Sequence, residues 1–296
     1  MIRVATRASA LARWQAERVG VRLGRDVELV FVSTTGDRDQ TSELHTIGGQ
    51  GVFTKEVQQA VIDGRADVAV HSAKDLPTET PPGLVLATIP ERADPRDALV
   101  GCAFAELVAG AQIGTGSVRR RAQLAAARPD LTYGPLRGNI ETRLRKREEL
   151  GYDAIVVALA ALERLGLTAT NEFDVLDVGV MLPQVAQGAL AAECRIDDSR
   201  TLARLRAIDD LVAHRNVDAE RAFLAELGGG CDLPCGALAQ GQPDGSIVLE
   251  ALLSSFDGQI VLRTRVGGDD PGDVGSTAAL DLLDGKGGRS LLDDVA

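Results

Sequence analysis

Residues 1–34 read MIRVATRASALARWQAERVGVRLGRDVELVFVST, a strand-like run, a helical run and a second strand-like run. The outer segments, MIRVAT (1–6) and VELVFVST (27–34), have the short apolar pattern that is typical of buried strands. The helical run extends from Ala10 to Leu23, and its spacing puts four residues on one side: Leu11, Trp14, Arg18 and Val21. This order predicts a strand–helix–strand unit of a parallel sheet.

The same alternation continues along the chain. KEVQQAVIDG (55–64) predicts a helix and ADVAVHS (66–72) a strand. A second set follows: AQIGTGS (111–117), VRRRAQLAAA (118–127), LTYGPLR (131–137), ETRLRKREEL (141–150) and DAIVVAL (153–159). Each set predicts a doubly wound α/β domain with a parallel sheet. PERADPRDALV (90–100), with two prolines and five charges, is interpreted as the linker between them.

The last third of the chain has a different pattern. Ala219 to Leu227 and Ala278 to Leu283 predict helices, and GALAQ (236–240), IVLEALLSS (247–255) and QIVLRTRVG (259–267) predict antiparallel strands. We therefore expect a smaller α+β domain at the C-terminus. The expected division is residues 1–92 with 189–208, residues 93–188, and residues 209–296.

Composition excludes several classes of function. The chain is 45% hydrophobic and 25% charged, as in globular proteins, and its net charge of −11 opposes binding to nucleic acid or anionic lipid. The longest uncharged apolar run, Ala154 to Leu162, is shorter than the roughly 20 residues of a bilayer span. The N-terminal residues lack a signal-peptide pattern, and four cysteines are too sparse for a disulfide framework. A cytoplasmic, reducing location is expected.

Basic residues are concentrated between Ser117 and Arg147, where nine Arg or Lys residues accompany two acids. Arg145, Lys146 and Arg147 suit an ordinary solvated helix face. Four of the other arginines, and Arg7 near the N-terminus, lie where a predicted strand passes into a helix. Each such corner combines arginine with a helix-capping residue: Arg7 with Ser9, Arg119 and Arg120 with Ser117, and Arg137 and Arg143 with Asn139.

Cations in the first turn of a helix oppose its dipole, so an anionic ligand would explain them better than solvent does. In doubly wound folds, such corners face the crevice at the carboxyl ends of the strands. The pattern therefore predicts a site for a ligand with several carboxylates or phosphates. A nucleotide is not favoured, because the chain has neither a Walker motif nor GxGxxG.

Two more motifs carry reactive groups. In HSAKDLP (71–77), Asp75 beside Lys74 can exchange a proton or balance a developing cation; the alternative is an ordinary aspartate in a turn closed by Pro77. In GGGCDLPCG (228–236), Cys231 is either a packed thiol or a covalent site. Its spacing from Cys235 and the absence of a nearby histidine do not suit zinc, and we predict no metal site.

Eight motifs occur in the order found in the porphobilinogen deaminase (hydroxymethylbilane synthase) family, which the chain resembles from about residue 2 to 240. They are RVATRASALARWQ (3–15), GGQGVFTKEV (48–57), RADVAVHSAKDLP (65–77), DPRDALV (94–100), IGTGSVRRRAQL (113–124), LRGNIETRL (136–144), YDAIVVALAALERLGL (152–167) and GGGCDLPCG (228–236).

The resemblance implies two domains similar to periplasmic binding proteins, a third smaller domain, and an active site between the first two. It implies a monomeric transferase of porphyrin and heme biosynthesis. Such an enzyme joins four porphobilinogen units head to tail, releases one ammonia per addition, and frees the linear tetrapyrrole by hydrolysis. The growing chain starts on a covalent dipyrromethane cofactor.

The resemblance also implies roles for individual residues. Asp75 corresponds to the catalytic aspartate and Cys231 to the cysteine that holds dipyrromethane by a thioether. The implied cofactor-binding residues are Ser72, Lys74, Thr115, Ser117, Arg119 and Arg120. The implied substrate-binding residues are Arg7, Ser9, Arg137, Asn139, Arg143 and Arg164, the last of these matching an arginine linked to chain elongation.

Four positions depart from the pattern of the family. Gly116 replaces a common serine, Ala186 a usual glycine before QGA, and Gln50 a frequent lysine, while Cys235 is a second thiol near the attachment site. Two other classes of function stay open: a non-enzymatic binding module for a small polycarboxylate, and a different cysteine-dependent enzyme acting on a polycarboxylate. Asp75 and Cys231 argue against the first, and an unmodified Cys231 would favour the second.

Overall fold

The computed structural model describes residues 1–24, 27–38, 51–229 and 232–292. The chain divides into two compact units, which we call the first and second units. The first unit comprises Met1–Ala93 and Gly188–Arg215, and the second Asp94–Gln187 and Asn216–Ala296. No helix among the described residues is both long and apolar enough to cross a membrane. The expected division into three domains stays a prediction.

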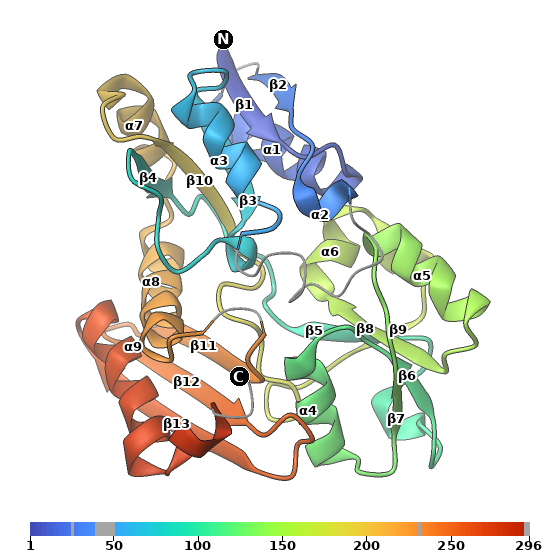
Figure 1. The fold of residues 1–296 in the computed structure, drawn as a ribbon. Coiled ribbons are helices and arrows are strands. Elements are labelled where there is room, and N and C mark those ends of the chain that lie inside the picture. The colour runs from blue at the N-terminus through green and yellow to red at the C-terminus, as the bar shows by residue number, and fades with distance from the viewer. Residues whose placement is uncertain (25–26, 39–50, 230–231, 293–296) are drawn as a thin grey trace. The chain divides into compact units, whose positions relative to one another are not determined.

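The first unit is built on a mixed sheet with the strand order β2-β1-β3-β10-β4 (Figure 1). Its strands are β1 (Ile2–Thr6), β2 (Val27–Phe31), β3 (Val68–Ser72), β4 (Leu84–Thr88) and β10 (Leu190–Arg195). β1 runs parallel to both β2 and β3, as predicted. β10 runs antiparallel to β3 and β4, so the sheet is not purely parallel, and this strand comes from far along the chain.

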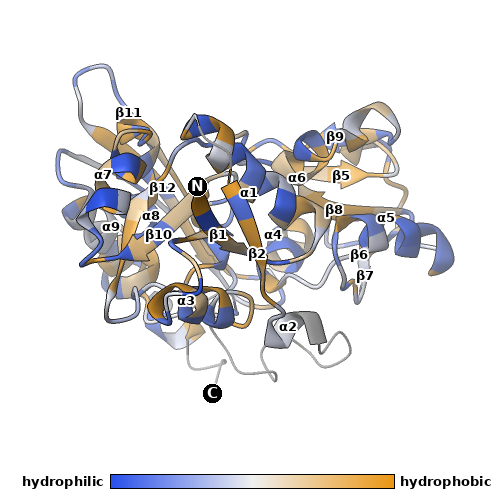
Figure 2. Ribbon diagram, turned by 90° about the horizontal axis from the view of Figure 1, so that it is seen from above, coloured by the Kyte–Doolittle hydropathy of each residue, from blue (hydrophilic) through white to orange (hydrophobic). Residues whose placement is uncertain are grey.

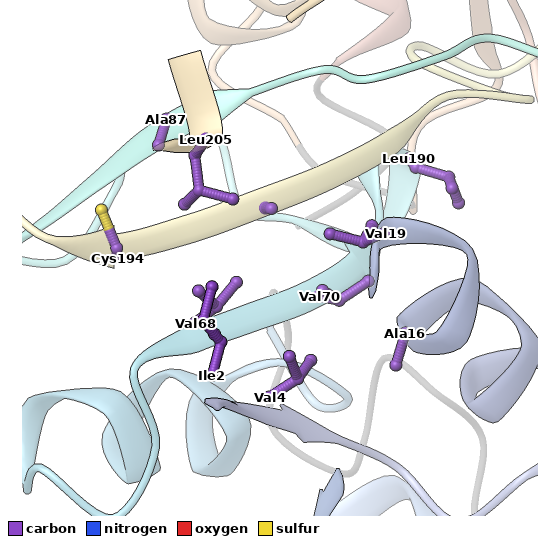
Figure 3. Packing of buried hydrophobic residues seen from close by; sticks show 11 residues of the cluster. Ile2, Val4, Ala16, Val19, Val68, Val70, Ala87, Leu190, Cys194 and Leu205 are labelled. Carbon is purple, nitrogen blue, oxygen red and sulfur yellow. The ribbon is translucent and has the colours of Figure 1, made fainter. Parts of the chain in front are cut away.

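Helices cover both faces of this sheet, which makes the first unit doubly wound. The helical segments are α1 (Ala10–Arg22), α2 (Thr35–Arg38), α3 (Lys55–Ile62), α7 (Ser199–Arg206) and the short 3₁₀ helix η1 (Ala73–Asp75). Val4 and Val68 point to the face that α1 and α7 cover, where Val19 and Leu205 complete one core (Figure 3). Ala5 and Ala69 point to the other face and pack against α3. Alternation along the strands therefore separates two cores.

Small residues make up most of the buried face of α1. The helix buries Gln15, Ala16, Val19 and Gly20, whereas Val21, on the side that also carries Leu11 and Trp14, is 70% exposed. A Cβ atom on Gly20 would lie 2.9 Å from the Val27 side chain, so α1 approaches β2 closely through small residues. Packing of the backbone against the sheet, and not the largest side chains, sets the rotation of this helix.

The second unit contains a sheet with the order β7-β6-β8-β5-β9. Its strands are β5 (Asp97–Val100), β6 (Gln112–Gly114), β7 (Thr132–Gly134), β8 (Ala154–Ala158) and β9 (Phe173–Val175), and its helices are α4 (Val118–Ala127), α5 (Ile140–Glu149), α6 (Leu159–Arg164), η2 (Phe104–Glu106) and η3 (Leu167–Ala169). Leu124 of α4 packs on one face and Ile140 of α5 on the other. Figure 2 shows hydrophobic colouring on β5 and β8 and hydrophilic colouring on α5.

The C-terminal part of the second unit forms an antiparallel sheet in the order β11-β12-β13. Its elements are α8 (Leu211–Glu226), which begins in the first unit, β11 (Cys235–Gly241), β12 (Ile247–Ser254), β13 (Val261–Gly268), α9 (Pro271–Leu280), the π-helical turn η4 (Asp281–Gly285) and η5 (Gly288–Leu291). α9 lies along β12 and β13 (Figure 1). Gly275 lets α9 approach α8, since a Cβ there would lie 2.3 Å from the Ala219 carbonyl oxygen. The fold class is therefore mixed α/β with a smaller α+β part, as predicted.

Several predicted boundaries were wrong. Residues 97–100, assigned to a linker, form β5 between β8 and β9 of the second sheet, because Asp97 is buried by internal partners and not solvated. β7 ends at Gly134, so Arg137 lies in the loop before α5 and not at the end of a strand. α8 begins at Leu211 and α9 at Pro271, whereas the predicted helices began at Ala219 and Ala278.

The connection from the second unit to β10 holds a residue with unusual backbone geometry. Ala186 has a φ of +59°, in the left-handed region, and it is fully buried. Its N–H donates to the buried carboxylate of Glu220 at 2.6 Å. This hydrogen bond holds an alanine in a conformation that favours glycine.

We expect Ala186→Gly to be less destabilising than Ala111→Gly by about 1–2 kcal/mol, which is the cost of the left-handed region for an L-residue. Ala111 is the matched control because it is also buried in a loop of the second unit, without a positive φ. Both changes remove one methyl group and raise the conformational entropy of the unfolded chain equally. The difference between the two losses of stability therefore measures the backbone strain at Ala186. Urea unfolding of both variants measures this difference, and equal losses of stability would contradict it.

Candidate functional site

A cavity of about 60 Å³ lies in the first unit, at the carboxyl ends of β1 and β3. Arg7 and Ser9 reach it from the turn after β1, and Ser72 and Asp75 from the end of β3 and the turn after it. The structure therefore brings together four residues that sequence analysis singled out at two separate corners. Gln15, Phe53 and His71 also line the cavity, and sequence analysis did not single them out.

Hydrogen bonds fix the corner after β1. Ser9 caps α1, since its hydroxyl accepts from the N–H of Ala12 at 3.3 Å. One turn further along α1, Gln15 Nε2 donates to Ser72 Oγ at 2.7 Å and so joins α1 to the end of β3. The Arg7 guanidinium stacks over the Phe53 ring, 4.3 Å from its centroid. The guanidinium is thereby oriented before any ligand binds.

Asp75 ends the single turn of η1. The turn is anchored on both sides, because Ala73 and Leu76 are buried and the Ala73 N–H donates to the Ala189 carbonyl at 3.0 Å. Asp75 itself is half-buried and faces the cavity, while Lys74 does not line it. The anchored turn thus presents the Asp75 carboxylate to the same cavity that Arg7 lines.

In the second unit, the first turn of α4 surrounds a buried carboxylate, that of Asp97. Arg119 donates from Nη2 to Asp97 Oδ2 at 2.8 Å and from Nη1 to the Leu182 carbonyl at 2.7 Å. Arg120 donates from Nη2 to Asp97 Oδ1 at 2.7 Å, from Nε to the same oxygen at 3.1 Å, and from Nη1 to the Val156 carbonyl at 2.9 Å. Both arginines were predicted to face a ligand, whereas their direct partner in the structure is Asp97.

The Asp97 cluster also controls the charge of its members. Burial alone would raise the pKa of Asp97, but the Arg119 and Arg120 guanidiniums outweigh it and hold that pKa far below its ordinary value. Burial lowers the pKa of Arg119. Gln187 adds a hydrogen bond from Nε2 to Asp97 Oδ1 at 3.0 Å. The cluster therefore has one negative and two positive charges, all nearly inaccessible to solvent.

One N–H donor of Arg119 forms no hydrogen bond with Asp97. The Nε atom of Arg119 is buried without a hydrogen-bond partner among the described residues, and Arg119 lines a narrow cavity of about 10 Å³ with Ser117, Gln184 and Cys235. That space accommodates about one water molecule. Arg120, in contrast, uses all three of its guanidinium nitrogens within the second unit. Of the two arginines, Arg119 is thus the one with a guanidinium nitrogen that forms no hydrogen bond among the described residues.

The corner before α5 repeats the capping arrangement. Asn139 caps α5 by accepting from the Thr142 N–H at 2.9 Å, and Arg143 Nε donates to the Gly138 carbonyl at 2.8 Å. The Nη1 atom of Arg137 is buried and forms no hydrogen bond within the described part of the chain. Arg164 is half-buried and ends α6.

The residues before α4 explain one departure from the pattern of the family. Thr115 is buried, and its hydroxyl accepts from the Ser117 N–H at 3.2 Å. A Cβ atom on Gly116 would lie 2.8 Å from the Leu136 carbonyl oxygen. The serine that is common in the family would therefore require this backbone to shift.

Of the two cysteines that follow α8 in the sequence, the structure describes Cys235 but not Cys231. Cys231 lies outside the described residues, as does Gln50. Cys235 is buried at the start of β11, opposite Leu253 of β12. Among the described residues, no group of three or more His, Cys, Asp or Glu side chains could hold a metal ion.

Comparisons with known proteins match almost the whole chain. Residues 2–203 match the family model "Porphobilinogen deaminase, dipyromethane cofactor binding domain", and residues 214–284 match its C-terminal domain. The porphobilinogen deaminase of Roseiflexus sp. is 45% identical, covering 98% of this chain and 97% of its own. That of Syntrophotalea carbinolica is 47% identical over 88% of this chain and 85% of its own.

Solved structures give a more distant match. A substrate-binding domain of a putative amino acid ABC transporter from Streptococcus pneumoniae is 10% identical, with a TM-score of 0.44, covering 77% of this chain and 94% of that one.

We expect Asp97→Asn to destabilise the second unit by about 3–5 kcal/mol, because it leaves two buried guanidiniums without a compensating charge. Asp130→Asn is the matched control, since Asp130 also pairs with an arginine, Arg128, but at the surface, and we expect no measurable change there. Because the folded-state pKa of Asp97 is lowered, its contribution is present above the unfolded pKa of about 4 and is lost as the pH falls through the folded value. Urea unfolding at neutral and acidic pH measures both effects; equal midpoints for the two variants would contradict them.

Proposed function

Because the chain belongs to the porphobilinogen deaminase family, we propose that it catalyses the hydroxymethylbilane synthase reaction. In this transferase reaction, four porphobilinogen molecules are joined head to tail with loss of ammonia, and water then releases the linear tetrapyrrole. The observation that carries the proposal is the convergence of Asp75 and Arg7 on one cavity of the first unit. That cavity provides a proton-exchanging carboxylate and a cation within one site.

The substrate explains why an acidic protein keeps so many oriented guanidiniums. Each porphobilinogen has two carboxylates, so a chain that grows to four units brings many negative charges into the protein. Arginine recognises carboxylates with two parallel hydrogen bonds. Arg7, held over Phe53, supports binding of one such group at the cavity of the first unit. Ser9, Gln15 and Ser72 supply further hydrogen-bonding groups around it.

Asp75 is the group for the chemical step. Loss of ammonia leaves a cationic azafulvene-like species, and a carboxylate fixed beside it stabilises that charge. The same carboxylate accepts the proton that the attacking pyrrole carbon must lose. Because η1 is anchored by buried residues on both sides of Asp75, the carboxylate stays oriented through successive additions.

The described residues fit the dipyrromethane cofactor that the family model names. The Arg119 Nε atom is a buried donor without an acceptor in the described ranges, and a carboxylate of the cofactor is an acceptor that suits it. When bound through Cys231, the cofactor supplies the first pyrroles of the growing chain. The proposed cofactor-binding residues are Ser72, Lys74, Thr115, Ser117, Arg119 and Arg120, and the proposed substrate-binding residues are Arg7, Ser9, Arg137, Asn139, Arg143 and Arg164.

We further propose that the enzyme works as a cytoplasmic monomer on small molecules, without nucleic acid or membrane partners. The net charge of −11 supports this, since it opposes association with nucleic acid and anionic lipid. The alternative of a non-enzymatic binding module would need Arg7 and the capping residues but no Asp75.

We expect Asp75→Asn to keep the fold and the cofactor but to lower the rate of porphobilinogen consumption by about 10²–10⁴-fold, the usual contribution of a general acid–base group. Glu79→Gln is the matched control, because Glu79 is an exposed acid in the following loop that does not line the cavity. The experiment measures turnover of porphobilinogen after intact-mass confirmation of the cofactor. Turnover by the Asp75→Asn variant within a few-fold of wild type would contradict the role of Asp75, and a wild-type protein without turnover would contradict the proposed function.

We expect the cofactor mass on Cys231 and not on Cys235. Cys235 is buried in the sheet, where a thioether-linked pyrrole would have no room, and the adjacent cavity holds about one water. Proteolysis before Asp232 separates the two cysteines, so peptide mapping assigns the added mass directly. Cys235→Ser should keep the adduct and Cys231→Ser should lose it; adduct mass on the Cys235 peptide would refute the assignment.

A further inference from the structure

The Phe53 ring under the Arg7 guanidinium also contacts a segment that the proposed chemistry does not use. The guanidinium lies 4.3 Å from the ring centroid, and both side chains line the cavity of the first unit. Neither side chain is fully buried, and a partly exposed side chain keeps rotamer freedom unless its neighbours restrict it. The contacts of the ring therefore bear on where the cation points.

Gly36, in the short helix α2, lies directly against this ring. A Cβ atom on Gly36 would lie 2.1 Å from Cε1 of Phe53 and 2.6 Å from Cδ1. Gly36 does not have a positive φ, so the missing side chain serves the close approach and not a special backbone conformation. The ring thus contacts the α2 backbone as well as Arg7.

Three hydrogen bonds join α2 to the segment that carries Phe53. The Gly36 N–H donates to the Val52 carbonyl at 3.2 Å. The Thr35 N–H and the Thr35 hydroxyl both donate to Glu56 Oε1, each at 2.7 Å. Hydrogen bonds to a carboxylate are about twice as strong as those between neutral groups. Glu56 therefore anchors Gly36 beside the ring.

The chain that leads into α2 is also tied to the corner after β1. The Val32 N–H donates to the carbonyl of Thr6, the residue before Arg7, at 2.9 Å. The contacts thus run from this corner through Gly36 and Phe53 back to Arg7. They fix the position of the ring relative to the backbone from which the Arg7 side chain extends.

We propose that Glu56 is a positioning residue which, through Gly36 and Phe53, holds the Arg7 guanidinium ready for an acidic side chain of porphobilinogen. The proposal rests on the proposed function and extends the role of Arg7 in it. Glu56 does not line the cavity, so it acts through the ring and not on the ligand. A guanidinium that is oriented in advance lowers the entropic cost of ordering it on binding.

The first test compares Glu56→Ala with Glu56→Gln as holoenzymes. Glu56→Ala removes the acceptor of both Thr35 hydrogen bonds, whereas the amide oxygen of Glu56→Gln can still accept them. Glu56→Ala should raise the KM for porphobilinogen about fivefold and change kcat less than about twofold, because the cation–π contact no longer orients the cation. Glu56→Gln should keep the wild-type KM. A wild-type KM in Glu56→Ala would overturn the proposal.

Gly36→Ala tests the same contact without removing a hydrogen bond, because the added Cβ displaces the ring. It should raise KM as Glu56→Ala does, and it replaces that variant if Glu56→Ala does not fold. In a Phe53→Leu background, neither change should raise KM further, since no ring remains to be positioned. Additive effects on KM would show that Glu56 acts on the fold in general and would overturn the proposal.

Asp198→Ala is the matched control. Asp198 also accepts a hydrogen bond from an N–H in the first turn of a helix of the first unit, that of Thr201 in α7 at 3.0 Å, and it does not line the cavity. Its substitution should lower the urea midpoint, because a helix cap is lost, and leave KM unchanged. A raised KM in this variant would make the change in KM a consequence of lost stability and overturn the proposal.

A spectroscopic measurement on the holoenzyme decides the orientation of Arg7 without turnover. Because a ring shields protons that lie over its face, the Arg7 Hδ resonances should be shifted upfield in the wild type and in Glu56→Gln. Glu56→Ala and Phe53→Leu should lose this shift, and its retention in Glu56→Ala would overturn the proposal. Turnover of porphobilinogen by the wild type tests the proposed function separately. A wild type with the upfield shift but no turnover would refute the link to porphobilinogen, and the variants would still decide whether Glu56 positions Arg7.

Discussion

The buried carboxylate of Asp97 is the constraint on which the second unit depends. It opens β5, and its two oxygens receive hydrogen bonds from Arg119, Arg120 and Gln187. These three residues belong to α4 and to the connection toward β10, so one carboxylate joins a strand, a helix and a crossing segment. Removing Asp97 would leave two buried guanidiniums unpaired in a low-dielectric interior, where an unpaired charge costs several kcal/mol. The arrangement of the arginines at the start of α4 is thus inseparable from the arrangement of the sheet.

In the first unit, single hydrogen bonds between uncharged groups position the polar side chains. Its cavity is bounded by a helix cap at Ser9, a side-chain hydrogen bond from Gln15 to Ser72, and a buried turn that carries Asp75. Each contact is local or joins adjacent elements at one edge of the sheet. The polar groups around the cavity are therefore oriented before a ligand arrives, which reduces the ordering cost of binding. Behind the cavity, Glu193 of β10 accepts hydrogen bonds from Gln58 of α3 and so joins that helix to the sheet.

Sequence patterns predicted the local parts of this structure and missed the long-range ones. Ser9, Ser117 and Asn139 were predicted as helix caps, and all three accept the expected backbone hydrogen bonds, because capping depends on a few neighbouring residues. Asp97 was assigned to a linker, since an acid in a proline-rich, charged stretch looks solvated until the arginines 22 and 23 positions away are placed beside it. Glu193 and Gln58 are 135 positions apart, so no local pattern links them. The roles of the individual site residues stay predictions, and Cys231 lies outside the described residues.

The buried donors without acceptors in the described ranges give a physical reason for the ligand binding that we propose for the second unit. A buried N–H that forms no hydrogen bond costs a protein about 1–3 kcal/mol, and Arg119 Nε and Arg137 Nη1 are such donors within those ranges. A carboxylate that reaches either atom removes this cost in addition to forming its own contact. Arg119 is fixed in place by Asp97 through the other end of its guanidinium, so its Nε cannot turn to find an internal acceptor. Asp97 and the proposed acidic ligand therefore would not compete for Arg119, because they would contact different nitrogens of its guanidinium.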